Sequence, residues 1–305
     1  MGTAGKDPQA KPGAPAAAPA AVDATLVFLY NLRMPELPEV ESIALSLRRK
    51  IRGLEISGID LRRAALLRRG GRRDLSPLLR RTVSAVRRRG KHLIIEAGDR
   101  VLIFHLKMTG GFLWVEPETP VDKHTHMILT FRNTRRELRF RDVRKFGFAL
   151  CLPAAGLAVC PELCTLGPEP LEIGADDFYA RLRTRRGRLK SVLLDQSFVA
   201  GIGNIYADEM LFESGIHPLA SAAGLSRARA GRLWKAMGDV LGRAVAAGGS
   251  SIRDFRNADG EIGRFQDDHR VYGRGGAPCP RCGRPIRRRT IGGRGSHFCP
   301  RCQKK

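Results

Sequence analysis

The first hydrophobic pattern in the chain is a helical one between Glu36 and about Arg52. Apolar residues recur there at intervals of three and four, at Leu37, Val40, Ala44, Leu47 and Ile51. That spacing places one apolar stripe along a helix. The sequence therefore predicts an amphipathic helix, opened by the prolines of PELPEV at 35–40.

Beyond this helix the pattern changes to short apolar or alternating runs with turn residues between them. The runs are LEISGIDL, TVSAVRRR, HLIIEA, RVLIFHLKM, GFLWVE, HMILTF, RELRFRD and GFALCL. Many short strands behind a single strong helix are typical of a β-sandwich or a barrel.

A Pro- and Gly-rich stretch at 152–177 ends the strand pattern and indicates a linker. The period then becomes 3.6, which predicts four helices. We expect Ser226 to cap the last of them, with Gly248 and Gly249 after its end. The predicted helices are near 176–184, 188–196, 204–214 and 226–247.

The fold class is thus α+β, with an N-terminal helix and a two-sheet β-sandwich followed by a helical domain and a small Cys-rich module. We place the sandwich domain at 34–152, the linker at 153–175, the helical domain at 176–270 and the Cys-rich module at 271–305. Residues 1–33 form an extension. Its Ala-, Pro- and Gly-rich tract cannot bury enough apolar surface to offset its ordering entropy, so we expect it to be disordered.

The net charge of +24, with 54 basic against 30 acidic residues, points to a polyanionic partner. An Arg-rich proteome would also give such a charge. Anionic lipid fits less well, because no basic helix carries an aromatic face. No apolar run reaches the ~20 residues of a membrane span, and none early in the chain suits a secretory signal. We expect a cytoplasmic protein.

Four of the seven cysteines lie in the last 27 residues, as two CxxC pairs. Two such turns can complete a tetrahedron around one ion. The spacing predicts one structural Zn²⁺ held by Cys279, Cys282, Cys299 and Cys302, with an iron–sulfur or redox role as the weaker alternative. With four thiolates present, we expect His297 to be a hairpin side chain and not a ligand.

Arginines run between the two CxxC pairs, at 287–289 and at Arg294 in the sequence GGRG. Glycines on both sides of Arg294 suit close approach to a phosphate backbone. A solvated charged hairpin is the alternative for the triple-Arg run.

Taken in order, MPELPEVE, GIGNIYADE and the Cys-rich module resemble the formamidopyrimidine-DNA glycosylases, from Met34 to about Lys305. The resemblance implies a helix–two-turn–helix in the helical domain and a β-hairpin zinc ribbon at the C-terminus. It also implies a base-excision repair enzyme, acting as a monomer on double-stranded DNA and associated with the nucleoid. Such an enzyme removes 8-oxoguanine and formamidopyrimidines and cuts abasic sites by β,δ-elimination.

In this family the initiator Met is removed and the next residue, here Pro35, is the nucleophile. A terminal proline is a secondary amine, whereas an acylated one has no useful lone pair. Met34 therefore resembles the true start, and residues 1–33 a mis-assigned upstream start or a removable leader. An ordinary proline in the first helical turn is the alternative for Pro35.

The resemblance further implies that Glu36 is the general acid and that Glu39 supports the nucleophile. Carboxylates in a first turn could instead simply complement the helix dipole. Lys91 would contact the lesion or a nearby phosphate, unless it is a solubility lysine at a strand edge. We add Arg294 to the catalytic residues, since an Arg that neutralises a phosphate as the base departs should help to lower the barrier.

For DNA binding, the resemblance implies two sets of residues. One fills the gap left by the flipped nucleotide: Met108, Arg144 and Phe146. The other contacts phosphates: His124, Lys190 and Asn204.

Two departures and two alternatives remain. Glu261, in the loop NADGEIGRFQ at 257–266 that matches the base-recognition loop, stands where some relatives carry a basic residue. This leaves the lesion preference open, while the extension leaves the state of Pro35 open. The alternatives are an endonuclease VIII-like glycosylase for oxidised pyrimidines and a non-catalytic zinc-ribbon nucleic-acid-binding protein.

Overall fold

The computed structural model describes residues 1–2, 34–69, 71–251 and 255–305. Met34–Lys305 forms one compact unit. The predicted disorder of the extension falls on 3–33, outside the described residues.

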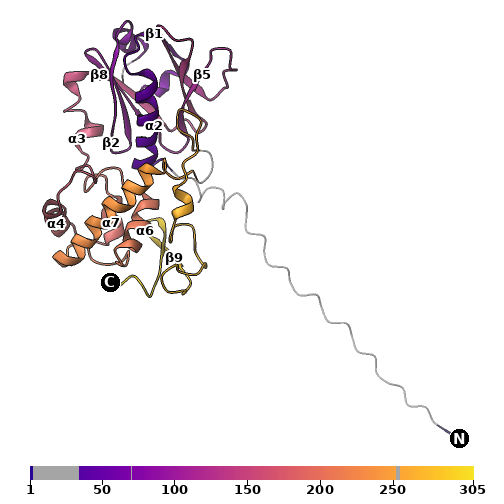
Figure 1. Ribbon diagram of the computed structural model, residues 1–305, viewed down its shortest axis with the longest axis vertical. Helices are drawn as coiled ribbons and strands as arrows, with labels where there is room; N and C mark the ends of the chain where they lie inside the picture. The colour runs from indigo at the N-terminus through magenta and orange to yellow at the C-terminus, as the bar shows by residue number, and fades with distance from the viewer. Residues whose placement is uncertain (3–33, 70, 252–254) are drawn as a thin grey trace. The chain divides into compact units, whose positions relative to one another are not determined.

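The predicted amphipathic helix is α2, Leu37–Ile51, and its apolar stripe is completely buried. Its N-cap is Glu36, whose backbone N–H donates to a carboxylate oxygen of Glu39 at 2.8 Å. This contact satisfies a donor that the helix itself leaves without a partner. α2 packs against the sheet that contains β2 (Val83–Arg89), and it also contacts α7 (Arg227–Ala246) of the helical domain (Figure 1).

Two four-stranded antiparallel sheets follow, as the strand pattern predicts. The first sheet has the order β1-β6-β7-β5 and the second β2-β3-β4-β8. Phe104, Phe112 and Phe140 meet between the sheets, in the same core as Val40 and Leu47 of α2. The strands are β1 Ile56–Leu61, β2 Val83–Arg89, β3 His92–Ala97, β4 Arg100–His105, β5 Gly110–Val115, β6 Thr125–Phe131, β7 Glu137–Asp142 and β8 Phe148–Pro153. Short 3-10 turns lie at Ala64–Leu66 (η1) and Arg72–Leu78 (η2).

The segment predicted as a linker is packed against the second sheet. It forms η3 (Ala154–Gly156) and the short helix α3 (Pro161–Cys164). Cys160 and Leu163 bury against the face of β4 and β8 that points away from the main core. The apolar residues between its prolines cause this packing, which the Pro- and Gly-rich composition concealed.

The helical domain contains the four predicted helices within one to two residues of their expected ends. They are α4 Ala175–Arg183, α5 Leu189–Leu194, α6 Asn204–Glu213 and α7 Arg227–Ala246. Ser226 caps α7, accepting a hydrogen bond from the Arg229 N–H. A second hydrophobic core, separate from that of the sandwich, unites these helices.

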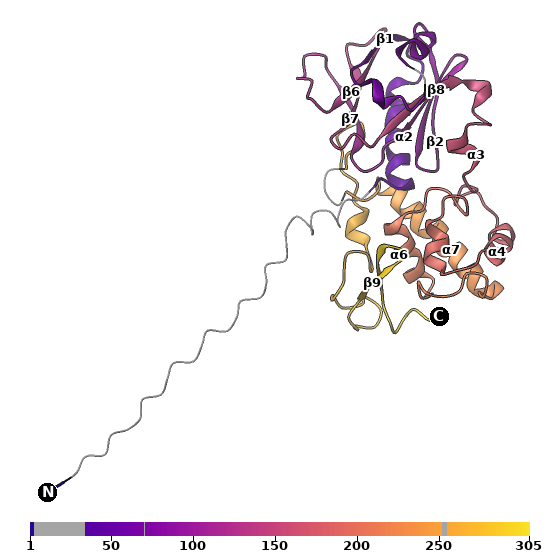
Figure 2. The ribbon, with the colours of Figure 1, turned by 180° about the vertical axis from the view of Figure 1, so that it is seen from behind.

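The C-terminal module is a hairpin of β9 (Arg287–Ile291) and β10 (Arg294–Phe298), preceded by η4 (Phe265–Asp268). β10 lies against α6 (Figures 1 and 2). The buried Glu209 of α6 accepts hydrogen bonds from the backbone N–H groups of residues 270–272, which holds the entry to the module. Among the described residues, no helix has the length and apolar character needed to cross a membrane.

Candidate active site and DNA-binding surface

The carboxylate of Glu36 lies at the N-terminus of α6, 169 residues away in sequence. It accepts hydrogen bonds from the N–H groups of Ile205 at 3.0 Å and Tyr206 at 3.4 Å. A Cβ at Gly203 would lie 2.2 Å from the Glu36 carboxyl carbon, so this approach requires glycine. The anion that faces the N–H groups of this Gly-rich helix start is therefore a carboxylate of the protein itself.

Burial raises the pKa of Glu36, while the positive charge of Lys91 and the α6 N–H groups oppose that shift. Burial and the negative charge of the neighbouring Glu36 together raise the pKa of Glu39 to about 7, against the opposing effect of its hydrogen bonds from Tyr206 and Ser250. A carboxyl group with a raised pKa can hold a proton near neutral pH and donate it. The Glu36 carboxylate accepts N–H groups at the start of α6, so complementing the dipole of its own helix, α2, does not account for its position.

Lys91 lies in the turn between β2 and β3 and is 7% exposed. Burial lowers its pKa, while the nearby Glu36 and Glu39 raise it. A solubility lysine would point into water, so this burial excludes the strand-edge alternative. Glu169 of the linker fixes the turn by accepting hydrogen bonds from Arg88, Arg89 and the Gly90 N–H.

Glu39 leads to a buried hydrogen-bond network that sequence reasoning missed. One carboxylate oxygen accepts from the Tyr206 hydroxyl at 2.5 Å and from the Ser250 N–H at 2.6 Å. The Ser250 hydroxyl in turn lies 3.0 Å from Nε2 of His269. Tyr206 is part of the quoted GIGNIYADE segment, but nothing in its spacing showed that it faces α2.

Lys190 and Asn204 converge on the hairpin that carries Arg294. The Lys190 ammonium donates to Asp208 at 2.6 Å and to the Gly295 carbonyl at 3.2 Å. Asn204 donates to the same carbonyl at 3.0 Å. Lys190 and Asp208 are completely buried side chains, and Arg294 is exposed. Lys190 therefore faces the protein interior, and it contacts the hairpin at the residue next to Arg294.

Asp208 also joins the hairpin to α6. Its second carboxylate oxygen accepts from the backbone N–H of His297 at 2.8 Å and lies 3.2 Å from the His297 ring. The His297 ring thus serves the hairpin, as expected from the sequence. Asp208 itself was missed, because its partners come from α5 and β10.

Met108, Arg144 and Phe146 come together on two neighbouring loops. The Arg144 guanidinium lies 3.0 Å from the Met108 sulfur and 4.5 Å from the centre of the Phe146 ring. Phe146 is 53% exposed, which is unusual for a large apolar side chain. This group, called here the wedge, consists of Met108, Arg144 and Phe146.

His124 lies beside the wedge, since its carbonyl accepts the N–H of Asp142, the residue two before Arg144. Asp122 accepts the His124 N–H at 3.1 Å and pairs with Arg141 at 2.6 Å, which holds the loop before β6.

The four cysteines of the two CxxC pairs gather in one place, with all four sulfurs within 4.8 Å of one another. The Cys279–Cys302 and Cys282–Cys299 sulfur distances are 3.9 and 3.5 Å. A tetrahedron with Zn–S bonds of about 2.3 Å needs sulfurs about 3.8 Å apart, so the cluster fits one zinc ion. All four ligands come from the protein, which makes the zinc site structural.

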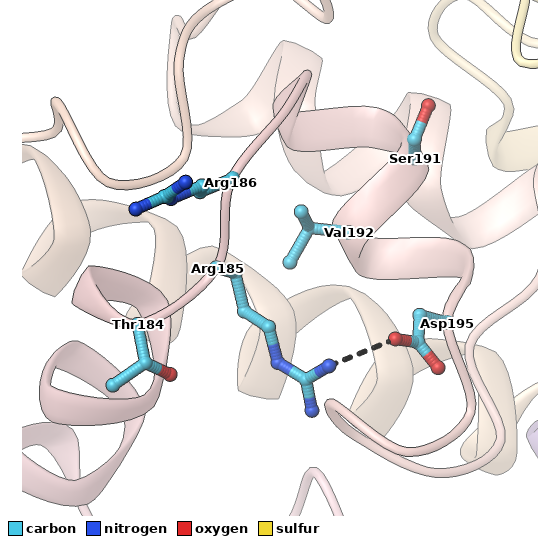
Figure 3. A pocket seen from close by; sticks show the side chains of 6 residues that line it. All are labelled: Thr184, Arg185, Arg186, Ser191, Val192 and Asp195. Atoms are coloured by element: carbon cyan, nitrogen blue, oxygen red, sulfur yellow. Dashed lines mark hydrogen bonds and ion pairs between the residues drawn. The ribbon is translucent and has the colours of Figure 1, made fainter.

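A hollow of about 410 Å³ lies between the end of α4 and α5, lined by Arg185, Arg186, Ser191 and Asp195 among others (Figure 3). Arg185 is already paired with Asp195 there at 3.1 Å. None of the predicted site residues lines this hollow, so it plays no part in the candidate site.

The buried Glu36 next to Pro35, the wedge and the Cys-rich hairpin beside the helical domain fit the helix–two-turn–helix class of DNA glycosylases. Models of the formamidopyrimidine-DNA glycosylase N-terminal domain and H2TH domain match residues 34–149 and 166–256. A third model, the zinc finger found in FPG and IleRS, matches 276–305. The chain belongs to the formamidopyrimidine-DNA glycosylase family, whose members excise damaged bases and cleave abasic sites.

Individual relatives agree over nearly their whole lengths. The formamidopyrimidine-DNA glycosylase of Solibacter usitatus is 46% identical over 259 residues, covering 84% of this chain and 94% of its own. That of Bacillus licheniformis is 44% identical, covering 89% of this chain and 100% of its own. A Lactococcus lactis FPG mutant in complex with Fapy-dG-containing DNA is 35% identical, with a TM-score of 0.83 over 89% of this chain and 100% of that one. The Thermus thermophilus MutM structure is 40% identical, with a TM-score of 0.79 over 88% of this chain and 98% of that one.

Proposed function

We propose that this chain excises oxidised purines from duplex DNA with Pro35 as nucleophile and Glu36 as general acid. The observation that supports this most directly is the buried Glu36 carboxylate, held against the α6 N-terminus with a raised pKa. Its position directly after Pro35 brings a proton donor to any sugar bonded to the Pro35 nitrogen.

Each chemical step then has a group to carry it. The Pro35 nitrogen attacks C1′ of the deoxyribose, the bond to the base breaks, and the base leaves with the bonding electron pair and takes up a proton. Glu36 donates its proton to the ring oxygen as the ring opens, and the nitrogen loses its proton to form an iminium. Elimination then expels the 3′ and the 5′ phosphate in turn. Lys91 and the exposed Arg294 stabilise negative charge near the reacting sugar.

Glu39 supports this centre by holding the backbone at the start of α2. It accepts the N–H of Glu36, which fixes the backbone directly after Pro35. The wedge fills the gap left by the flipped nucleotide, where Arg144 can hydrogen-bond the orphaned base. His124 and Arg294 contact phosphates, and Lys190 and Asn204 support Arg294 through the Gly295 carbonyl.

We also propose that the protein acts as a monomer on chromosomal DNA in the cytoplasm, with domains at 34–152, 176–270 and 271–305. The strongly positive charge favours such a location. Fluorescence imaging of the tagged protein checks the location, and limited proteolysis checks the boundaries. A diffuse fluorescence signal that is not enriched at the nucleoid would contradict the proposed location on chromosomal DNA.

Borohydride trapping tests the proposed nucleophile. Borohydride reduces the iminium to a stable amine, so a chain starting at Pro35 becomes covalently linked to DNA containing 8-oxoguanine. A matched chain that keeps Met34 has an acylated Pro35 nitrogen, and we expect no cross-link from it. The 305-residue chain should behave like this control.

The same assay separates the remaining alternatives. Trapping on duplexes with oxidised pyrimidines but not on those with 8-oxoguanine would indicate an endonuclease VIII-like specificity. DNA binding without trapping, even from a chain starting at Pro35, would indicate a non-catalytic zinc-ribbon protein and overturn the proposal.

A further inference from the structure

The wedge residues come from two loops that a single buried carboxylate joins. Asp142, at the end of β7, is completely buried. Its carboxylate accepts the Gly147 N–H at 2.7 Å and the Arg144 N–H at 3.2 Å, which closes the loop that carries Arg144 and Phe146. The Thr109 hydroxyl donates to the same carboxylate from the other loop, next to Met108.

The Thr109 hydroxyl connects the loops in both directions. It donates to Asp142 and accepts the Arg144 N–H at 3.0 Å. The backbone around this connection is constrained, since Lys107 and Lys145 have φ angles of +52° and +60°. Left-handed conformations of this kind are costly for residues other than glycine, and they persist only where surrounding contacts enforce them.

We propose that Thr109 is a positioning residue that locks Met108 to the Arg144–Phe146 loop, so that the three wedge residues enter the duplex as one preassembled unit. This inference rests on the proposed function of the wedge. Without the lock, the Met108 loop must be ordered during insertion, and that ordering reduces the free energy available for nucleotide flipping. With the lock in place, the contacts of Arg144 with Met108 and Phe146 are already formed before DNA binds.

Thr109→Val is the direct test, because valine keeps the shape of threonine and loses the hydroxyl. Thr109→Ser keeps the hydroxyl and should restore function. Thr130→Val is the matched control: it removes a hydroxyl that accepts a side-chain hydrogen bond from Ser57 at 3.1 Å within the first sheet. All variants start at Pro35, since the proposed nucleophile needs a free Pro35 nitrogen.

Two substrates distinguish a loss of wedge positioning from a general loss of activity in the Thr109→Val protein. Duplex DNA containing 8-oxoguanine requires the wedge, whereas a single-stranded abasic oligonucleotide has no partner base and does not. We expect Thr109→Val to slow single-turnover excision from the duplex about tenfold, with abasic cleavage in the single strand within about twofold of the unsubstituted protein. 2-Aminopurine placed opposite the lesion should report slower insertion to the same degree.

Met108→Ala and Phe146→Ala test the proposed role of the wedge separately from the proposed role of Thr109. If these two variants leave duplex excision and the fluorescence signal unchanged, the proposed role of the wedge is wrong. If these two variants slow both duplex excision and the fluorescence change while Thr109→Val slows neither, the proposed role of the wedge is supported and the proposed role of Thr109 is wrong. We also expect Thr109→Val to add little to Met108→Ala, because both disable the same unit. Fully additive effects would overturn the lock.

Discussion

Two buried lysines, Lys91 in the sandwich domain and Lys190 in the helical domain, are held in different ways. Lys190 forms a direct ion pair with Asp208 at 2.6 Å. Lys91 is influenced by the charges of Glu36 and Glu39, and it forms no ion pair with the carboxylates of the described residues. A lysine with a dedicated partner anchors the structure, whereas one without such a partner remains available to a bound substrate.

The buried glutamates Glu209 and Glu36 serve different parts of the molecule, although burial raises the pKa of both. Glu209 accepts three backbone N–H groups and serves the architecture of the C-terminal module. Glu36 accepts two from α6, and burial, the largest influence on its pKa, keeps that pKa raised. The helical side of the site thus contains a buried lysine with a carboxylate partner, whereas the buried lysine of the sandwich side lies near Glu36 and Glu39 without an ion pair to the carboxylates of the described residues.

The largest effect should come from Glu36→Gln. Glutamine keeps the size of the side chain and cannot donate the proton, so single-turnover excision should fall by about 10⁴-fold, or ~5.5 kcal/mol. Urea unfolding should show unchanged or higher stability, because a desolvated carboxyl group is gone. A loss of less than about tenfold would assign the acid to another residue.

Lys190→Met and Lys91→Met make the same substitution at the buried lysine of the helical domain and at that of the sandwich domain. Lys190→Met leaves Asp208 buried without its cation, so the free energy of unfolding should drop by about 4 kcal/mol. Lys91→Met should leave stability nearly unchanged and reduce excision instead. Equal stability losses in the two variants would remove the distinction between the two lysines.

The pH dependence of stability should reveal Glu39. Its folded-state pKa of about 7 lies above the ordinary value of 4.5, so its contribution is fully present below pH 4.5 and is lost as the pH rises through 7. Between these values the unsubstituted protein should lose about 3 kcal/mol that Glu39→Gln does not lose. Parallel stability curves for the two proteins would contradict the raised pKa.

The smallest effect concerns salt. Six or so phosphate contacts give a log–log slope of binding against salt of roughly −5. Arg294→Gln should bring this slope about one unit closer to zero. Arg185→Gln is the control and should leave it unchanged, since Arg185 is paired with Asp195. Equal slopes for all three proteins would remove Arg294 from the phosphate contacts.

The sequence by itself determined the local elements and the family. The apolar stripe of α2, the strand runs, the Ser226 cap and the two CxxC pairs are short-range patterns, since a helix, strand or metal turn is encoded within a few residues. It also suggested which residues carry the chemistry, through motifs that are contiguous in the chain.

Only the tertiary structure decided which of those residues meet. Glu36 meets Ile205 across 169 positions, Lys190 turns inward to Asp208, and Thr109 reaches Asp142 across 33. Such partners belong to separate elements, and no periodicity links them. Their proximity follows from how helices and sheets pack, and that packing also desolvates the glutamates and lysines enough to shift their pKa values.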